Sequence, residues 1–252
     1  MKQVTCIALY GKKPESLSHL IKSCSEIVKE SNFRPIFEPY RMDQVHGTFI
    51  GMEKTGGIPG FCNANIWIQT DKREVMNFSP LMDTVRKYLP LKIRFGGFGK
   101  TFHGFKSFGK FPFERSFQIQ RSAGKVILIG WPHRNDDFSS NPPLRTLRME
   151  VEERCNIRHK YAGDNDLYMV IGEIADMENL PQSERQEIND ATSGIEERVR
   201  DFLENNPIDV EIEPEQVFFA RYRRESLPLD STETYCINKS GIDAGFIRNL
   251  YR

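Results

Sequence analysis

Residues 45–53 read VHGTFIGME, a short apolar run of the kind that forms a β-strand. Side chains two residues apart point to the same face of a strand, so His46 and Thr48 project together. An imidazole exchanges protons near neutral pH, and a neighbouring hydroxyl can hold a phosphate oxygen. His46 and Thr48 are therefore candidate catalytic residues. A histidine at a strand edge that bonds a backbone carbonyl would explain the same pattern.

Residues 166–174 read DLYMVIGEI, a run that is almost continuously apolar after its first residue. Such a run predicts a strand in the interior of a sheet. The period of two places Asp166 and Tyr168 on one face of this strand. A carboxylate can accept a proton and a phenol can donate a hydrogen bond to phosphate, so both are further candidate catalytic residues.

The rest of the chain alternates between strand and helix patterns. Further strands are expected at residues 3–10, 91–97, 114–120, 125–132, 208–213, 216–222 and 233–237, and helices at 14–30, 80–88, 143–155 and 183–204. Residues 54–67 are rich in glycine and are expected to form a loop. Because some strands follow one another directly, the order indicates an α+β or mixed fold. No repeat or linker interrupts the sequence, so we expect a single domain over 1–252.

The charge of the chain is balanced, with 35 Lys and Arg against 35 Asp and Glu. This balance excludes a histone-like protein but not local patches. Between residues 92 and 134, nine Lys or Arg accompany a single acid, which predicts a positive field over one lobe. A mean hydropathy of −0.52 argues against a membrane protein. Five widely spaced cysteines without a CxxC pair predict a reducing, cytoplasmic location and no structural zinc.

The order of elements and the His46-Gly47-Thr48 motif resemble the 2H phosphoesterase superfamily. Its RNA-ligase-like and cyclic-phosphodiesterase members carry two His-x-Thr or His-x-Ser motifs, and residues 45–53 and 166–174 take the places of the two motif strands. The resemblance implies a bilobal α+β fold in which two antiparallel sheets form a central groove, with helices packed outside. It also implies hydrolysis without metal or cofactor, in which His46 is the general acid/base and Thr48 holds the phosphate.

The second motif of the family is replaced in this chain by Asp166-Leu167-Tyr168. In the family one histidine activates water and the other protonates the leaving oxygen. Here Asp166 and Tyr168 stand in place of the second motif, and His159, slightly upstream, is an alternative substrate-binding donor. The loss of a second histidine equally fits a protein that binds its ligand without hydrolysing it.

Residues 94–117 read RFGGFGKTFHGFKSFGKFPFERSF and contain eight phenylalanines among glycines and lysines. Aromatic rings stack on bases, and arginines hold phosphates in a bidentate manner. We therefore expect Phe102 and Trp131 to stack on a base. Arg94 and Arg115 are expected to hold a phosphate. Alternatively, the phenylalanines fill the groove, or the loop is a contact surface for a protein partner.

The sequence favours a metal-independent cyclic phosphodiesterase acting on a 2′,3′-cyclic phosphate, or a related cyclic phosphodiester, of a nucleotide or RNA end. Two alternatives belong to other classes. The first is a catalytically degenerate module that binds nucleotides or RNA in the same groove. The second is a protein-interaction module that uses the phenylalanine-rich loop.

Overall fold

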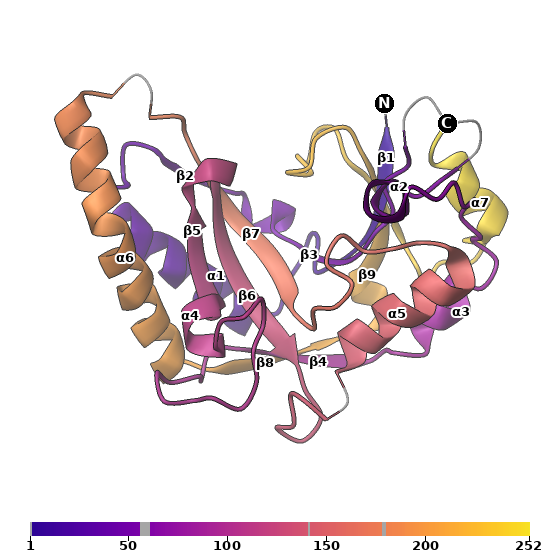
Figure 1. Cartoon of the computed structure of the whole chain (residues 1–252), viewed down its shortest axis with the longest axis horizontal. Coiled ribbons are helices and arrows are strands. Elements are labelled where there is room, and N and C mark those ends of the chain that lie inside the picture. The colour runs from indigo at the N-terminus through magenta and orange to yellow at the C-terminus, as the bar shows by residue number, and fades with distance from the viewer. Residues whose placement is uncertain (1, 56–60, 141, 178–179) are drawn as a thin grey trace.

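The computed structural model describes residues 2–55, 61–140, 142–177 and 180–252. These ranges contain ten strands and seven α-helices, arranged as Figure 1 shows. The strands are β1 (Gln3–Ala8), β2 (Phe37–Pro39), β3 (Gly47–Gly51), β4 (Leu91–Phe95), β5 (Phe117–Gln120), β6 (Lys125–Pro132), β7 (Leu167–Ile174), β8 (Ile208–Ile212), β9 (Val217–Tyr222) and β10 (Glu233–Cys236). The helices are α1 (Glu15–Lys29), α2 (Ala64–Thr70), α3 (Leu81–Arg86), α4 (Pro112–Ser116), α5 (Pro143–Cys155), α6 (Gln182–Asn205) and α7 (Ala244–Asn249).

The ten strands form one sheet in the order β10-β9-β1-β3-β7-β6-β4-β8, with β2 added to β7 and β5 added to β6. All strand pairings in it are antiparallel. The α+β class is therefore confirmed. The apolar run that forms β7 lies in the interior of the sheet, as its composition predicts.

The expectation of two separate sheets is wrong, because β3 and β7 join the two halves. Their junction is narrow: only Gly47 and Met169 are in register between them. Beside this pair the buried Arg148 of α5 inserts its guanidinium, and its Nη2 donates to the carbonyls of both Thr48 and Asp166 at 3.1 Å. The two carbonyls thus accept hydrogen bonds from the Arg148 side chain. The two halves of the sheet diverge from this junction (Figure 1).

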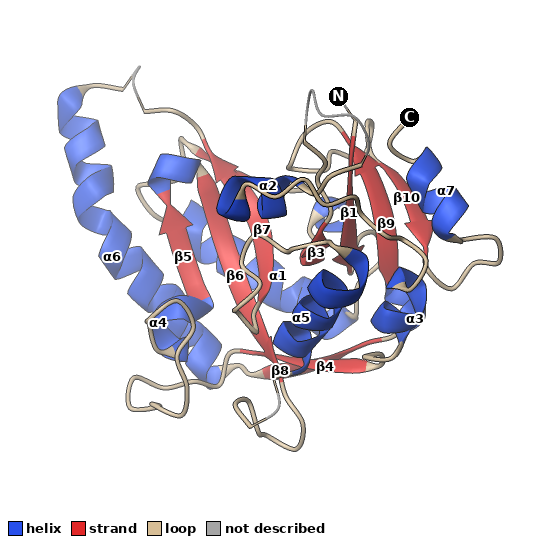
Figure 2. Ribbon diagram, turned by 45° about the vertical axis from the view of Figure 1, so that its right-hand side comes forward, coloured by secondary structure: helices blue, strands red, loops and turns tan. Residues whose placement is uncertain are grey.

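One face of the sheet carries the main hydrophobic core, which helices cover. On α1 the buried apolar positions are spaced as on an amphipathic helix, as the sequence predicts. They are Leu17, Leu20, Ile21, Cys24 and Val28. Helix α6 packs on α1 and β5, whereas α3 and α5 pack together beside the other half of the sheet (Figure 2).

The expected loop at residues 54–67 is wrong in its last part, where α2 begins at Ala64. Asn63 caps this helix, because its side-chain oxygen accepts from the Ile66 amide at 3.0 Å. Residues 56–60 of that loop lie outside the described residues. Among the helices that the structure describes, none is long and apolar enough to cross a membrane.

Candidate functional site

His46, Thr48 and Tyr168 project from the face of the sheet opposite the main core. Because Gly47 and Met169 are directly opposed and Met169 points into the core, their neighbours point the other way. We call this the site face. The sequence placed the histidine and the tyrosine on separate strands, and the register brings those strands side by side.

His46 is arranged as a neutral proton acceptor. Its Nδ1 lies 2.8 Å from the carbonyl oxygen of Gln44, which can only accept, so Nδ1 carries the proton and Nε2 the lone pair. Burial lowers the pKa of His46 to about 4, against the opposing effect of the hydrogen bond to Gln44, and the nearby charge of Lys13 adds a smaller lowering. The ring also meets Tyr10 edge to face, with centroids 6.0 Å apart.

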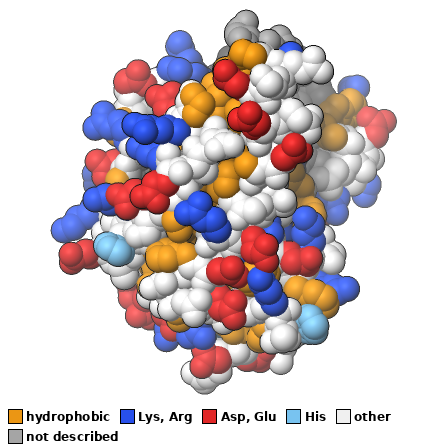
Figure 3. Space-filling view, turned by 90° about the vertical axis from the view of Figure 1, so that its left-hand side faces the viewer, with side chains coloured by type: hydrophobic (Ala, Val, Ile, Leu, Met, Phe, Trp, Pro, Cys, Tyr) orange, Lys and Arg blue, Asp and Glu red, His pale blue; other side chains and the backbone are white. Residues whose placement is uncertain are grey.

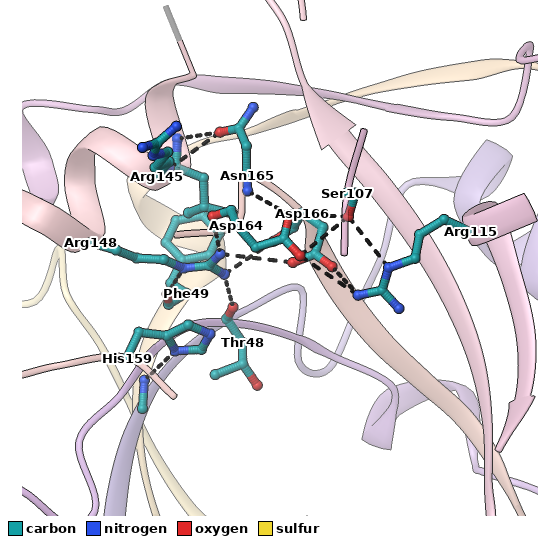
Figure 4. Close-up of polar contacts among 12 residues, drawn as sticks. Thr48, Phe49, Ser107, Arg115, Arg145, Arg148, His159, Asp164, Asn165 and Asp166 are labelled. Carbon is teal, nitrogen blue, oxygen red and sulfur yellow. Dashed lines mark hydrogen bonds and ion pairs between the residues drawn. The ribbon is translucent and has the colours of Figure 1, made fainter. Parts of the chain in front are cut away.

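Asp166 is held in a buried charge cluster rather than free to face His46. Its Oδ2 accepts from Arg115 Nη2 at 2.9 Å, and its Oδ1 lies 3.8 Å from Arg148 (Figure 4). Burial and the neighbouring Asp164 raise the pKa of Asp166 to about 6, against the opposing effect of the two arginines. Ser107 donates to Asp164 at 3.0 Å. This cluster of two carboxylates and two guanidiniums positions Arg115.

His159 also has a structural role. Its Nδ1 accepts a hydrogen bond from the backbone amide of Gly51 at 3.0 Å. Burial and the charges of Arg148 and Lys160 hold the pKa of His159 well below its usual range. The imidazole therefore fixes the loop after α5 against β3 (Figure 4). His159 is not among the residues that line the pocket described next.

A pocket of about 230 Å³ lies on the site face beside Tyr168. Strands β5 and β7, helix α4 and two loops contribute its walls. We call it the Arg115 pocket, and its lining residues are Phe108, Lys110, Arg115, Gln118, Gln120, Tyr161 and Tyr168. Of the residues that the sequence singled out, the structure places Arg115 and Tyr168 in this pocket.

A chain of hydrogen bonds fixes which groups the pocket offers to a ligand. Arg115 can only donate, so Gln118 turns its oxygen to Arg115 Nη1 at 2.8 Å. The same oxygen accepts from Gln120 at 3.3 Å, and the oxygen of Gln120 accepts from the Tyr168 hydroxyl at 3.2 Å. The Gln118 amide nitrogen keeps no acceptor among the described residues. The floor of the pocket is therefore rich in N–H donors, which suits an anion.

Two exposed aromatic rings stand at the mouth of the pocket. Phe108 is 55% exposed and Tyr161 43% exposed, and their centroids lie 5.0 Å apart. The guanidinium of Arg115 lies 4.6 Å from the Phe108 ring, and the ammonium of Lys160 lies 5.4 Å from the Tyr161 ring. We call Phe108 and Tyr161 the aromatic pair. Rings beside cations are the groups on which bases stack.

The structure corrects the aromatic residues expected to bind a base. Trp131 is 1% exposed and packs edge to face on Phe98 and Phe105. Phe102 is half-buried in the same cluster, which covers β6 on the site face. Trp131 therefore cannot stack on a base in this arrangement, and most of the phenylalanine-rich loop fills space against the sheet. Of the eight phenylalanines in residues 94–117, Phe108 is the one that the structure leaves exposed, at the tip of the loop with φ of 50° before a glycine.

Arg94 is also corrected as a phosphate ligand of this pocket. Arg94 lies opposite Trp131 where β4 pairs with β6. Its Nε and Nη2 donate to the two oxygens of Asp209 at 2.9 and 2.8 Å. Its Nη1 lies 2.7 Å from Asp136. The guanidinium is thus bound by carboxylates at the edge formed by β4 and β8.

The predicted positive field is largely neutralised. Five of the nine basic side chains in residues 92–134 form ion pairs, and Lys92 and Arg94 both pair with Asp209, more than 100 residues away in the chain. The five are Lys92, Arg94, Lys100, Arg115 and Lys125. On the face that carries α6, positive and negative side chains are interspersed (Figure 3). Lys110 and Arg115 line the pocket, and Lys160 lies beside the Tyr161 ring.

The described residues contain no group of three His, Cys, Asp or Glu side chains that could hold a metal ion. No family model matches the chain, and no curated protein matches its sequence. Among solved structures the chain is similar to a conserved protein of unknown function from Agrobacterium tumefaciens. The TM-score is 0.45 with 9% identity, over 88% of this chain and 80% of that chain. At this level of similarity the neighbour indicates neither a family nor a function.

Proposed function

We propose that this chain is a binding module for the phosphate-bearing end of a nucleotide or of single-stranded RNA, held in the Arg115 pocket. The observation that carries the proposal is the placement of unpaired N–H donors at the floor of the pocket and of two exposed aromatic rings at its mouth. A phosphate accepts hydrogen bonds from the floor, and a base stacks on the aromatic pair.

The size of the pocket supports a ligand that enters by one end. At about 230 Å³ it is smaller than the roughly 300–1,000 Å³ of sites that enclose whole small molecules. A phosphate and part of its sugar fit within such a volume. The base and any further nucleotides then lie outside, against Phe108 and Tyr161.

The state of the polar groups supports binding rather than turnover. Asp166 is occupied by Arg115, and the Nδ1 of His159 is occupied by a backbone amide. Neither group faces the pocket as a free acid or base. A hydrolase of the 2H type needs two such groups on opposite sides of the phosphate, and the chain keeps the motif histidine only at His46.

We also propose that the fold is a relative of the 2H phosphoesterases. Two adjacent antiparallel strands, β3 and β7, carry His46-Gly47-Thr48 and Asp166-Leu167-Tyr168, and both segments turn side chains to the site face. The diverging halves of the sheet on either side of this junction support a bilobal arrangement. The replacement of the second motif by Asp166-Leu167-Tyr168 fits a family member that still binds its ligand but no longer catalyses a reaction.

Hydrolysis of a cyclic phosphodiester is the second candidate, and one observation favours it. The proton on Nδ1 of His46 leaves Nε2 as a free base, which is the form that activates water. In that case Thr48, on the same face, would hold the phosphate, and Tyr168 would donate to it from β7.

Calorimetric titration tests the proposal with three probes: adenosine 2′,3′-cyclic phosphate, a short RNA with a 3′-phosphate, and the same RNA with a 3′-hydroxyl. We expect the phosphorylated RNA to bind more tightly than the hydroxyl form and its affinity to fall with added salt. Equal affinity for the two RNAs, or no binding of any probe, contradicts the proposal. Chromatography of the products decides the second candidate, since turnover that disappears in His46→Ala establishes hydrolysis instead.

A further inference from the structure

The tip of the phenylalanine-rich loop is a two-residue hairpin. The backbone amide of Ser107 donates to the Lys110 carbonyl at 2.9 Å, and the Lys110 amide donates to the Ser107 carbonyl at 3.1 Å. Phe108 and Gly109 form the turn, and both have positive φ, as the tight turn of a hairpin requires. Ser107 donates to Asp164 and Lys110 lines the Arg115 pocket, so these two side chains mark the pocket side of the hairpin.

The opposite side of the hairpin carries a second group of aromatic and basic side chains. Because side chains alternate along an extended arm, Lys106 and Phe111 point away from the pocket side. The His103 and Phe111 rings have centroids 4.2 Å apart, and the Lys106 ammonium lies 4.9 Å from the centroid of the Phe111 ring. His103 and Lys106 are exposed, and Phe111 is half-buried. We call these three residues the outer site, and the turn that carries Phe108 separates it from the pocket.

The hairpin keeps its positive charge. Residues 99–113 contain no Asp or Glu. Among the described residues, neither Lys106 nor Lys110 forms an ion pair, whereas Lys100, earlier in the same loop, is paired with Glu197 and Asp201 of α6. The ammonium groups of the hairpin are therefore free to pair with an anion. The carboxylates beside Lys100 limit how far along the loop an anionic strand can extend.

Along the sheet, by contrast, the pocket is bordered by carboxylates. Gln120, which lines the pocket, lies in one row with Lys125 and Glu173 across β5, β6 and β7. Glu225, from the loop between β9 and β10, lies 3.3 Å from the Lys125 ammonium. Glu173 and Glu225 are both exposed. A phosphate in this row would meet two carboxylates and one ammonium, so repulsion disfavours this direction for a nucleic-acid strand.

We propose that the outer site holds the second nucleotide of a bound RNA, an inference that rests on the proposed function of the Arg115 pocket. The strand then leaves the pocket over the turn of the hairpin. The terminal phosphate lies in the pocket and its base on the aromatic pair. The next phosphate accepts from Lys106, and the second base stacks on the exposed His103 ring, which accepts any base because every base has a π-face. The acids beside Lys100 leave no favourable place for further phosphates.

Calorimetric titration with oligoadenylates of one, two and four nucleotides, each with a 3′-phosphate, tests this path. We expect affinity to rise about tenfold from one nucleotide to two, and to change less than about threefold from two to four. Lys106→Gln and His103→Ala should each weaken binding of the dinucleotide about fivefold and leave the mononucleotide unchanged, whereas His103→Phe keeps a ring and should bind as wild type. Lys106→Gln should also lower the slope of log Kd against log salt concentration by about 0.7, for the dinucleotide alone.

Two control variants separate the outer site from a general effect of charge. Lys100→Gln removes a cation of the same loop that acids already bind, and Lys125→Gln removes the cation of the sheet row, so both should bind the dinucleotide as wild type does. Equal affinity of wild type for one and two nucleotides refutes the outer site and leaves the proposed function standing. A gain that is lost in Lys125→Gln but kept in Lys106→Gln means that the strand follows the sheet, which also overturns the outer site. Absence of binding by all three RNAs refutes the proposed function and the outer site together.

Discussion

Gln118→Glu is the sharpest single change to the Arg115 pocket, because it reverses the polarity of one wall at almost constant shape. The side-chain oxygen of Gln118 accepts from Arg115 at 2.8 Å, and a glutamate keeps that bond. The second carboxylate oxygen of the glutamate replaces the amide nitrogen of Gln118, which we expect to donate to the phosphate. The variant therefore loses two N–H donors and gains a negative charge where the ligand is negative.

The expected loss of affinity follows from these two effects. A hydrogen bond to a charged group contributes about 1.5–3 kcal/mol. Two like charges about 4 Å apart repel by roughly 4 kcal/mol at an effective dielectric constant near 20, and the adjacent Arg115 offsets much of this. A combined loss of about 3 kcal/mol corresponds to an increase in Kd on the order of 100-fold.

Calorimetric titration with the 3′-phosphorylated RNA measures this loss. The matched control is Gln182→Glu, the same change of charge at the exposed start of α6, where a negative charge is favourable and the side chain does not line the pocket. Urea unfolding should give Gln118→Glu a stability within about 1 kcal/mol of wild type, because the bond to Arg115 is preserved. A folded Gln118→Glu protein that binds the RNA as tightly as wild type would refute a contact between the Gln118 amide and the phosphate.

Three further outcomes are expected. Tyr161→Ala should weaken RNA binding by about 1–3 kcal/mol while Tyr161→Phe does not, by the same titration, since stacking needs only the ring. Arg148→Met should destabilise the fold by about 3–5 kcal/mol in urea unfolding, because it leaves buried carboxylates short of a partner; the exposed Arg154→Met on the same helix should cost less than about 1 kcal/mol. The stability that neutral His46 contributes is complete above pH 6.5 and is lost as the pH falls toward 4, about 3 kcal/mol in all, so His46→Gln should flatten unfolding free energy against pH in this window. An unchanged pH profile in that variant contradicts the burial of a neutral imidazole.

The sequence by itself determined the elements whose signals are local. The apolar spacing from Leu17 to Val28 predicted α1, and the turn at 121–124 between two apolar runs predicted the hairpin of β5 and β6. The almost continuous apolar run of β7 predicted an interior strand, and β7 pairs with β2, β3 and β6 in the sheet. A period of two fixed which residues share a face with His46 and with Tyr168, without saying how the two strands meet.

The tertiary structure decided which of the candidate residues are free to act. Arg94 and Arg115 look alike in the sequence, and both pair with carboxylates in the structure, but of the two it is Arg115 that lines the pocket. Partners such as Arg115 and Asp166 lie 51 residues apart, so no local pattern pairs them. In the same way, eight similar phenylalanines gave no sign that Phe108 would be the exposed one and would lie beside Tyr161. Packing and ion pairing join distant parts of the chain, and they decide which groups remain for a ligand.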